Sequence, residues 1–565
     1  MAGAGVICGL KLTHDGAVAV LDGDRLVFSV EAEKIDNRRR HAALPELADV
    51  VDQLDRHGVD VGDLDAVSVD GWVQSTDGLA GARIVDEQGE RMVDLAGYAV
   101  IGTPEEPLPA LGAFAGSGFP LGGKTFEYHS YPHATGHAFA SYSTSPHALR
   151  RAPALVLVWD GGMPATLYRI DPGAGTLMSL GVVVPMVGAL YPVFAAQFDP
   201  FRVPAERRRE LGGLGDFAQL EALLPVSGKA MAYAALDHPD ERAIAAMVEV
   251  SAAMGPVGIT GAFVWSHRVI AKVAGLGLSD AALIASFQEY LFRVLREGLA
   301  NGPGARYFAD GEPLCLSGGC ALNIKWNSGL RASGHFSDVW VPPFPNDAGS
   351  AIGTACAERF RRTGEVGLEW SVFSGPDVVA SSAAPGWSGR PCDLAELARL
   401  LHTDGEPVVV VSGRAELGPR ALGHRSIIAP ATTAAMRDRL NDIKGREHYR
   451  PVAPICLVDR AAEVFAPGTP DPHMLFEHHI RPGWADRVPA IVHTDGSARL
   501  QTVGPDHPVA YELLTEYARL SGVPVLCNTS ANHPGRGFFP DAGSAMRWGG
   551  VTRVWSEGVL YTSGG

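Results

Sequence analysis

The sequence predicts a mixed α/β protein with at least two domains. The chain has 565 residues, of which 46% are hydrophobic and 19% charged; this is enough apolar material for large cores and more chain than one compact domain usually holds. A pattern of three short strands occurs twice in the first half of the chain. Between residues 375 and 391 the composition shifts to Ser, Ala, Gly and Pro, which is typical of a linker. We therefore expect one domain at residues 1–375 and a second at residues 376–565.

The repeated pattern is a three-strand meander. Strand-like runs at residues 6–10, 17–21 and 25–29 are separated by Asp15-Gly16 and Asp22-Gly23-Asp24, which favour turns. Similar runs occur at residues 154–159, 165–168 and 176–180, with Asp160-Gly161 in the first turn. The chain therefore contains the same unit twice.

Helices and further strands are expected after each meander. Actin-like and sugar-kinase-like ATPases have such a duplicated arrangement, with a nucleotide in the cleft between the halves, and the comparison holds at the level of fold. The sequence predicts a helix at residues 44–54, a strand at 66–70, a helix after the N-cap Ser279, strands at 313–316 and 338–341, and a helix from Ser350.

The second domain is also predicted to mix helices and strands. Apolar spacing predicts helices at residues 394–401 and 507–520, and short apolar runs predict strands at residues 407–412, 491–493 and 523–527. Together with the first domain, these elements indicate an α/β protein.

Two histidines suggest a metal site. His133 and His137 lie four residues apart behind Pro132, so a helix would place both imidazoles on one face. Asp160 and Asp347 each follow a predicted strand beside a glycine, and they are the best candidates to complete the ligand set. Nitrogen and oxygen ligands without a thiolate suit Fe, Mn or Zn, whereas Mg usually binds oxygen alone. A pair of structural histidines is the alternative interpretation.

A glycine loop and a histidine in a turn add two weaker signals. Gly318 and Gly319, between a strand and the segment ending at Asn323, are typical of a loop that contacts a nucleotide phosphate or ribose, and a plain tight turn is the alternative. His14 lies in the first turn of the first meander, where residues of such a fold face the cleft. A histidine there could remove a proton from an acceptor hydroxyl, but a turn histidine without a role explains the pattern equally well.

Basic residues gather in the second domain. Six of the basic residues between positions 414 and 450 are separated by glycines and prolines rather than by helical spacing: Arg414, Arg420, Arg425, Lys444, Arg446 and Arg450. In an acidic protein this pattern favours an anion pocket over solvated surface charge. Asn528 and Ser530, at the end of a predicted strand, add neutral donors.

The composition excludes some classes of protein. A formal net charge of −16 argues against a protein that wraps a nucleic-acid backbone. Seven scattered cysteines without a Cys-x-x-Cys pair predict a reducing, cytoplasmic environment. Lys11 and Asp15 interrupt the first apolar segment and no later run suggests a membrane span, so we expect a soluble protein without a membrane partner.

Several segments resemble a known family. They occur in this order: Gly-Leu-Lys-Leu-Thr-His14-Asp-Gly, His133-x-x-x-His137, Gly228-Lys229-Ala-Met231, Ser317-Gly-Gly-Cys-Ala-Leu-Asn323, Asp347-Ala-Gly349, Glu416-Leu-Gly-Pro-Arg-Ala-Leu-Gly-His-Arg-Ser426, Lys444-x-Arg-Glu-x-Tyr-Arg-Pro451, Asp495-Gly-Ser-Ala-Arg-Leu-Gln-Thr502 and Asn528-Thr-Ser530. Together they resemble the O-carbamoyltransferases of the nodulation and antibiotic-tailoring family. The segments that begin at Glu416 and Asn528 are the specific ones.

The resemblance implies a fold and a reaction. The N-terminal domain would be actin-like, similar to the metal-binding enzyme of tRNA threonylcarbamoylation, and the C-terminal domain would be similar to its threonylcarbamoyl-adenylate synthase partner, that is, YrdC-like. The C-terminal domain would convert carbamoyl phosphate and ATP, with Mg²⁺, to carbamoyl adenylate. The N-terminal domain would then transfer the carbamoyl group to a hydroxyl of a small natural product, for example an ansamycin-type macrolactam.

The resemblance also implies roles for individual residues. A metal ion, Fe²⁺ first and Mn²⁺ or Zn²⁺ as alternatives, would be held by His133, His137, Asp160 and Asp347. The nucleotide would contact Gly318, Gly319 and Asn323. Carbamoyl phosphate and ATP would be bound by Arg420, Lys444, Arg450, Arg499, Asn528 and Ser530, with Arg420 and Lys444 acting in catalysis. His14 would be the base toward the acceptor alcohol.

The chain departs from the family pattern at two positions, and other functions are open. Ala531 stands where an aromatic residue usually follows, and Arg536 stands where an acidic residue is usual. A fused tRNA threonylcarbamoyladenosine-type enzyme is one alternative, which the acidic composition disfavours. An actin-like ATP-binding regulator is another, but it leaves the cationic second domain unexplained. The run Arg207–Arg209 has no assigned role, and the oligomeric state is not indicated.

Overall fold

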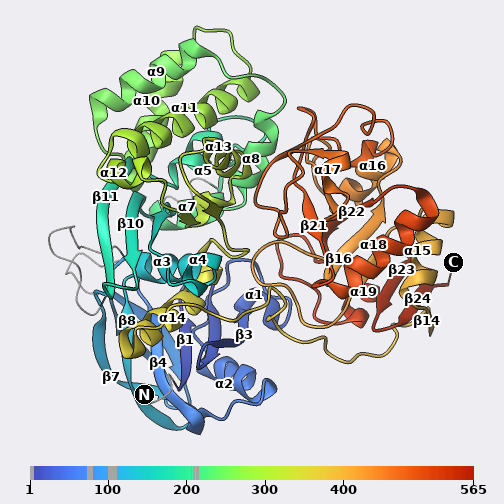
Figure 1. The fold of residues 1–565 in the computed structure, drawn as a ribbon, viewed down its shortest axis with the longest axis horizontal. Coiled ribbons are helices and arrows are strands. Elements are labelled where there is room, and N and C mark those ends of the chain that lie inside the picture. The colour runs from blue at the N-terminus through green and yellow to red at the C-terminus, as the bar shows by residue number, and fades with distance from the viewer. Residues whose placement is uncertain are drawn as a thin grey trace. The chain divides into compact units, whose positions relative to one another are not determined.

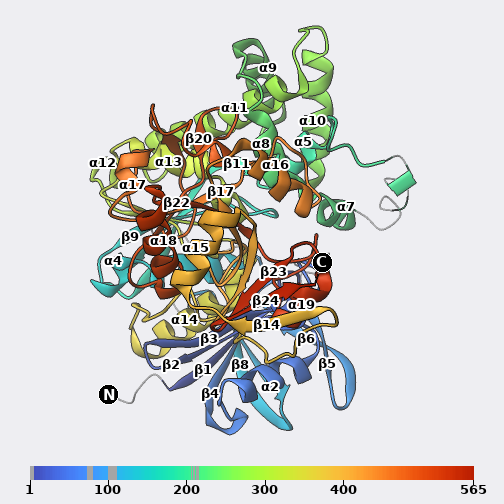
Figure 2. The ribbon, with the colours of Figure 1, turned by 90° about the vertical axis from the view of Figure 1, so that its right-hand side faces the viewer.

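The computed structural model describes residues 5–72, 80–98, 111–204, 206–207, 210 and 216–564 (Figures 1 and 2). The chain forms two compact units. Unit 1 holds the described residues up to 150 and from 342 onward, and unit 2 holds the described residues of 151–341. Unit 1 is therefore built from both ends of the chain, and a domain boundary near residue 375 stays a prediction.

The first sheet of unit 1 contains the first predicted meander. Its order is β3-β2-β1-β4-β8-β7, and Figure 2 shows β1 to β4 side by side. The strands are β1 (Val6–Lys11), β2 (Ala17–Asp22), β3 (Arg25–Glu31), β4 (Leu64–Asp70), β7 (Phe114–Leu121) and β8 (Lys124–Tyr131). β1 pairs antiparallel with β2 and parallel with β4, and β4 pairs parallel with β8. The predicted strands of this region are confirmed.

Helices from distant parts of the chain pack around this sheet. They are α1 (Ala32–Ile35), α2 (Leu47–Arg56), α3 (His133–Ser143), α4 (Pro146–Leu149) and α14 (Ser350–Thr363), and a separate hairpin is formed by β5 (Ala80–Asp86) and β6 (Gly89–Leu95). α2 buries Leu47, Val50 and Leu54 against the sheet core, as its apolar spacing predicts. α14 packs on β1, β2 and β4 and against α3.

The close packing of α3 and α14 depends on a glycine. A Cβ atom added at Gly353 would lie 1.8 Å from the carbonyl oxygen of Gly136, which is between His133 and His137 in α3. Gly353→Ala is therefore expected to destabilise unit 1 by about 1–3 kcal/mol, because overpacking forces the two helices apart. The midpoint of urea unfolding of the full chain would show the loss.

A matched control for this substitution lies in a helix of unit 2. At Gly261, in α10 (Ile259–Val273), an added Cβ would meet Cγ1 of Val257 at 3.6 Å, which is ordinary contact. Gly261→Ala should be neutral or slightly stabilising, since Ala favours a helix over Gly by up to about 1 kcal/mol. Equal midpoints for the two variants would contradict the tight helix pair.

Unit 2 contains the second predicted meander. Its sheet order is β11-β10-β9-β12-β13, with strands β9 (Ala154–Val158), β10 (Pro164–Asp171), β11 (Thr176–Val187), β12 (Leu314–Ser317) and β13 (Val339–Trp340). β9 pairs antiparallel with β10 and parallel with β12, which repeats the pairing of β1 with β2 and β4. The internal duplication predicted from the turns is therefore present in the topology of the two sheets.

The helices of unit 2 lie mainly between β11 and β12 in the sequence. They are α5 (Leu190–Ala195), α7 (Asp216–Leu223), α8 (Val226–Ala234), α9 (Glu241–Met254), α10, α11 (Asp280–Asn301) and α12 (Ala305–Ala309), followed after β12 by α13 (Ile324–Ala332). The predicted N-cap of α11 is confirmed, because the Ser279 hydroxyl accepts a hydrogen bond from the Ala282 amide at 3.0 Å. Of the arginine run, Arg207 is exposed and pairs with Glu210, while Arg208 and Arg209 lie outside the described residues.

The C-terminal part of unit 1 is built on an eight-stranded sheet of order β14-β24-β23-β15-β16-β22-β17-β21. The strands are β14 (Trp387–Pro391), β15 (Val408–Val411), β16 (Arg425–Pro430), β17 (Ala453–Leu457), β21 (Gln501–Val503), β22 (Val525–Ser530), β23 (Arg553–Ser556) and β24 (Val559–Ser563). A smaller sheet is formed by β18 (Phe465–Ala466), β19 (His478–Ile480) and β20 (Ser497–Ala498). The helices are α15 (Leu394–Asp404), α16 (Ala434–Ile443), α17 (Ala461–Val464), α18 (Pro508–Ser521) and α19 (Ala542–Trp548) (Figure 1).

Two sequence predictions in this part are wrong. No strand forms at residues 491–493. Ile491 ends a short 3₁₀ helix, Pro489–Ile491, which Pro489 can begin because it supplies no backbone donor, and residues 492–493 belong to no helix or strand. The end of the expected linker forms β14, an edge strand that pairs with β24. Its sequence, Trp-Ser-Gly-Arg-Pro, has no apolar alternation, since β14 pairs through its backbone and most of its side chains are exposed. Among the described residues, no helix has both the length and the apolar character needed to cross a membrane.

Candidate functional site

The two histidines of α3 lie together, as their spacing predicts. The helix begins at His133, directly after Pro132, and every one of its residues is buried. Nε2 of His133 and Nε2 of His137 are 3.1 Å apart. Two imidazole nitrogens that converge in this way can bind one metal ion.

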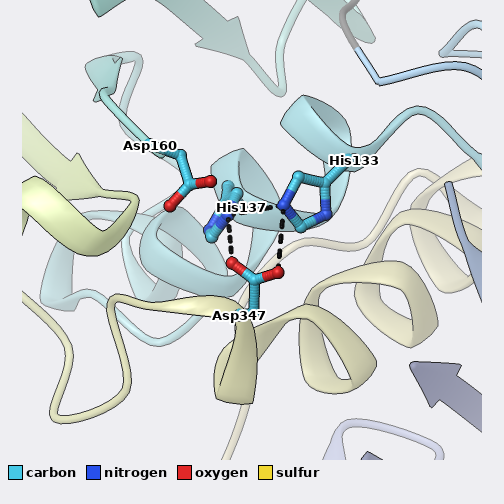
Figure 3. A group of neighbouring side chains, drawn as sticks. All are labelled: His133, His137, Asp160 and Asp347. Atoms are coloured by element: carbon cyan, nitrogen blue, oxygen red, sulfur yellow. Dashed lines mark hydrogen bonds and ion pairs between the residues drawn. The ribbon is translucent and has the colours of Figure 1, made fainter. Parts of the chain in front are cut away.

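Asp347 adds a carboxylate to the histidine pair within unit 1. It begins the short 3₁₀ helix Asp347–Gly349, just before α14. Its Oδ1 lies 3.4 Å from Nε2 of His137, and its Oδ2 lies 3.4 Å from Nε2 of His133 (Figure 3). The ligand atoms of these three buried residues all lie within 4.8 Å of one another. Two nitrogens and a carboxylate without a thiolate fit Fe²⁺, Mn²⁺ or Zn²⁺.

Two further residues hold this group in place, and sequence reasoning missed both. Asp70 ends β4, and its Oδ2 lies 2.6 Å from Nδ1 of His133. Lys11 ends the neighbouring parallel strand β1, and its Nζ lies 2.9 Å from Asp70 and 3.2 Å from Asp347. A carboxylate on Nδ1 orients the ring and leaves Nε2 for a metal. The sequence could have indicated them, because Lys11 and Asp70 stand at the ends of two predicted strands that become parallel neighbours.

Buried charges determine the protonation of this group. Burial opposes the ionised form of Asp347, but Lys11 and His133 outweigh it and hold the pKa of Asp347 well below its usual value. Burial also acts to lower the pKa of His133, but Asp70 and Asp347 raise that pKa to about 9. The neighbouring carboxylates therefore favour the protonated imidazole, and a divalent ion would take the place of its proton. This donor set fits a metal ion.

Asp160 belongs to unit 2, where the glycine loop positions it. The amide of Gly319 donates a hydrogen bond of 2.9 Å to Oδ1 of Asp160. Gly318 has a φ of +87°, and an added Cβ would lie 2.3 Å from the carbonyl oxygen of Trp159, so this close turn requires glycine. Figure 3 draws Asp160, whose carboxylate could offer a metal ligand.

Asn323 follows the glycine loop and has a structural contact. Its side-chain oxygen caps α13 by accepting hydrogen bonds from the amides of Lys325 and Trp326, at 3.2 and 3.3 Å. The loop therefore continues through a 3₁₀ turn, Gly319–Leu322, into a capped helix. Contacts of Gly318, Gly319 and Asn323 with a nucleotide stay a prediction.

His14 lies beside the group in unit 1. Its Nε2 is 3.3 Å from Oδ2 of Asp347, and its ring centroid is 4.9 Å from that of Trp72. About a quarter of its side chain is exposed. Its buried Nδ1 has no hydrogen-bond partner within the described parts of the chain. A partly exposed imidazole next to a carboxylate is suited to accept a proton from a small molecule.

The cations of the C-terminal part separate into two groups. Arg414 and Arg425 donate to backbone carbonyls, Arg414 to Gly375 at 2.9 Å and Arg425 to Ser412 at 2.6 Å. These two arginines therefore hold loops together. The interpretation of all six cations as one anion pocket is wrong for Arg414 and Arg425, because their guanidinium groups are already committed to the backbone.

The other cations affect one another's charge. Burial lowers the pKa of Arg420, and Arg499 and Arg450 lower it further. Burial and neighbouring arginines also lower the pKa of Arg446 to about 9 and that of Arg499 to about 10. Nε of Arg420 and Nε of Arg499 are buried without a hydrogen-bond partner among the described residues. Half-buried cations with too little neutralising charge are suited to bind an anion.

Lys444 lies within this second group. It follows α16, and its Nζ donates to the carbonyl oxygens of Ser530 and Asn532 and to Oδ1 of Asn532, at 2.7, 2.8 and 2.6 Å. These three acceptors match the three N–H bonds of an ammonium. Burial, with Arg446 as the next largest cause, lowers the pKa of Lys444 to about 7. A bound anion would favour its charged form.

Asn528 and Ser530 lie in β22, which extends beyond the strand predicted at residues 523–527. Asn528 donates to the carbonyl oxygen of Ala421 at 2.9 Å, and its own Oδ1 is buried without a partner among the described residues. The hydroxyl of Ser530 donates to Asn532 at 2.6 Å.

Glu416 holds the loop before β16 by accepting from three backbone amides, those of Leu422, His424 and Arg425.

Comparison with known proteins shows matches along nearly the whole chain. Residues 6–356 match the family model described as carbamoyltransferase N-terminus, and residues 398–554 match the carbamoyltransferase C-terminus. Nodulation protein U of Rhizobium tropici is 44% identical over 98% of this chain and 96% of its own length. The 3'-hydroxymethylcephem-O-carbamoyltransferase of Streptomyces clavuligerus is 34% identical over 96% of each chain. A solved glucokinase from Balamuthia mandrillaris is 12% identical to this chain, with a TM-score of 0.24. The match covers 63% of this chain and 93% of the glucokinase chain, and it supports no argument about fold.

Proposed function

The chain belongs to the carbamoyltransferase family, and from that premise we propose that it is an ATP-dependent O-carbamoyltransferase with two separate reaction sites. The observation that carries the proposal is the group of under-neutralised cations around Lys444. Carbamoyl phosphate and ATP are both polyanions, and such a pocket would bind their phosphates. The eight-stranded sheet would then be a YrdC-like domain, and the duplicated sheets an actin-like domain.

The first reaction would make carbamoyl adenylate. Carbamoyl phosphate, ATP and water would yield the adenylate, phosphate and pyrophosphate, with Mg²⁺ accompanying ATP. Arg420, Arg450 and Arg499 would hold the phosphates, and Lys444 would offset the charge that develops as phosphate oxygens leave. Asn528 and Ser530 would add neutral contacts. This role is supported by Nε of Arg420 and Nε of Arg499, which have no hydrogen-bond partner in the described part of the chain.

The second reaction would transfer the carbamoyl group to an alcohol. His14 would remove the proton of the hydroxyl as its oxygen attacks the carbamoyl carbon, and AMP would leave. The contact of His14 with Asp347 supports this role, because a carboxylate orients an imidazole. Gly318, Gly319 and Asn323 would contact the nucleotide part of the adenylate.

A metal ion would assist the second reaction. His133, His137 and Asp347 in unit 1, with Asp160 of unit 2 as the fourth ligand, would hold Fe²⁺ or, as alternatives, Mn²⁺ or Zn²⁺. Such an ion supplies Lewis acidity toward a carbonyl or phosphate oxygen. Asp70 would keep the ring of His133 in its binding orientation.

The acceptor would be a hydroxyl of a small natural product. The name of the Streptomyces clavuligerus relative gives a hydroxymethyl group of a cephem as that enzyme's acceptor. We propose the same chemical class for this chain, a hydroxyl on an antibiotic-type scaffold such as an ansamycin macrolactam. The acidic net charge of −16 gives no support for tRNA as the acceptor.

Incubation of the full chain with ATP, carbamoyl phosphate and Mg²⁺ tests the proposal. We expect pyrophosphate release and a carbamoyl adenylate detectable by mass spectrometry, and a carbamoylated product when a panel of hydroxylated natural products is added. Omitting carbamoyl phosphate is the control. No pyrophosphate with both substrates present would overturn the proposal, and a requirement for threonine and bicarbonate would indicate the tRNA-modifying reaction instead.

A further inference from the structure

A segment near the N-terminus lies against a loop of the C-terminal part, and both belong to unit 1. The amide of Arg40 donates to the carbonyl oxygen of Gly535 at 2.9 Å, and the amide of Gly537 donates to the carbonyl oxygen of Arg38 at 3.0 Å. A Cβ added at Gly537 would lie 1.8 Å from the carbonyl oxygen of Glu33, so the two backbones touch. This packing fixes the position of the Arg40 backbone.

The same loop is held at its other end by Lys444. The Lys444 ammonium donates to the carbonyl oxygens of Ser530 and Asn532, and the Asn532 side chain donates to the carbonyl oxygen of Arg536 at 2.7 Å. One short loop, residues 530–537, therefore contacts Lys444 at its start and the backbone of Arg40 near its end. The two cations are positioned by a common structure.

The charge of Arg40 is only partly neutralised. Its Nε lies 3.6 Å from a carboxylate oxygen of Glu33, beyond hydrogen-bond distance, and this nitrogen is buried without a hydrogen-bond partner among the described residues. The side chain is 39% exposed, so part of it is open to a ligand. Burial is the largest cause that lowers the pKa of Lys444, Arg420 and Arg450, and the charge of Arg40 lowers each of them further. This agrees with the backbone contacts, which put Arg40 and Lys444 against the same loop.

We propose that Arg40 is an anion-binding residue of the pocket around Lys444, contributed from the N-terminal part of the chain. Its guanidinium binds phosphate oxygens of the ligand that Arg420 and Arg450 also bind, and Lys444, whose three N–H bonds are taken up by Ser530 and Asn532, acts there through its charge. The ligand class is a phosphate ester or anhydride that carries more than one negative charge, since four cations that influence one another's charge exceed what one monoanion would neutralise. This inference rests on the proposed function, in which that ligand is carbamoyl phosphate or ATP.

The first prediction is a loss of affinity in Arg40→Gln. Titration calorimetry of the full chain with ATP and, separately, with carbamoyl phosphate should show at least one ligand bound roughly 10-fold more weakly, because one charge-assisted hydrogen-bonding group is lost. Arg39→Gln is the matched control, since it removes the same charge from the exposed neighbouring residue. Arg40→Lys should restore part of the affinity by restoring the charge.

A structural role for Arg40 would give a different result. If Arg40 only supported the loop, Arg40→Gln would lower the melting temperature without ligand, and the rise in melting temperature produced by ATP would match that of Arg39→Gln. That result, or equal affinities for the two variants, would overturn the inference while leaving the proposed function intact. Failure of the unaltered chain to bind either ligand would overturn both.

Discussion

Lys444→Ala is expected to abolish carbamoyl adenylate formation. The substitution removes the ammonium that bridges Ser530 and Asn532 and that lies among Arg446, Arg450 and neighbouring cations. Without this charge, the phosphate oxygens would lose a fixed partner as negative charge develops, and loss of one such group costs roughly 10²–10³-fold in rate. Pyrophosphate release from ATP in the presence of carbamoyl phosphate measures the effect. A normal adenylate yield would remove Lys444 from the site.

The exposed lysine at the start of β8 provides a control for this substitution. Lys124→Ala removes the same charge in unit 1 and should leave pyrophosphate release unchanged. A second measurement separates charge from folding. Because burial and nearby arginines lower the pKa of Lys444 to about 7, its amine is largely neutral above that pH, and a bound anion should raise the pKa again. ATP binding near pH 8 should therefore take up protons in the unaltered chain and fewer in Lys444→Ala, as calorimetry in buffers of different ionisation enthalpy would show.

His14→Asn is expected to leave adenylate formation intact and to lose transfer to the alcohol. The imidazole of His14 lies next to Asp347 in unit 1. His14 is not one of the cations around Lys444, where the adenylate would form. Loss of a general base typically reduces a rate by about 10²–10⁴-fold. Product formation with a hydroxylated acceptor, followed by mass spectrometry, measures transfer. If transfer and adenylate formation both continue unchanged, His14 is not the base.

The metal content of purified variants shows whether a histidine acts as a base or as a metal ligand. His14→Asn should keep the metal that the unaltered chain holds after purification, because His133, His137 and Asp347 are all present. His137→Ala should lose much of it, since this substitution removes a nitrogen 3.1 Å from that of His133. Elemental analysis of the purified variants measures this. Equal metal content in His137→Ala and the unaltered chain would exclude His137 as a ligand. Partial recovery of transfer in His14→Asn on addition of imidazole would support the base assignment.

Local patterns predicted much of the fold and part of the site. Strands of both meanders follow from short apolar runs bounded by Asp-Gly turns, and the histidine pair follows from a four-residue spacing within one helix. The run at residues 491–493 was too short for its periodicity to separate strand from helix, and the proline at 489 favoured the 3₁₀ turn. The edge strand β14 lacked an apolar pattern, because backbone pairing with β24 forms it.

The sequence by itself determined the duplicated meander, the helix that carries His133 and His137, and the gathering of cations in the second half of the chain, because each depends on residues close together in the chain. Only the tertiary structure decided which charges act together. Asp70 and Lys11 lie beside His133 because two parallel strands end side by side, the guanidinium of Arg425 donates to backbone carbonyls, and the amide of Arg40 donates to the carbonyl oxygen of Gly535, far along the chain. Contacts between residues so distant in sequence follow from packing, which no local spacing encodes.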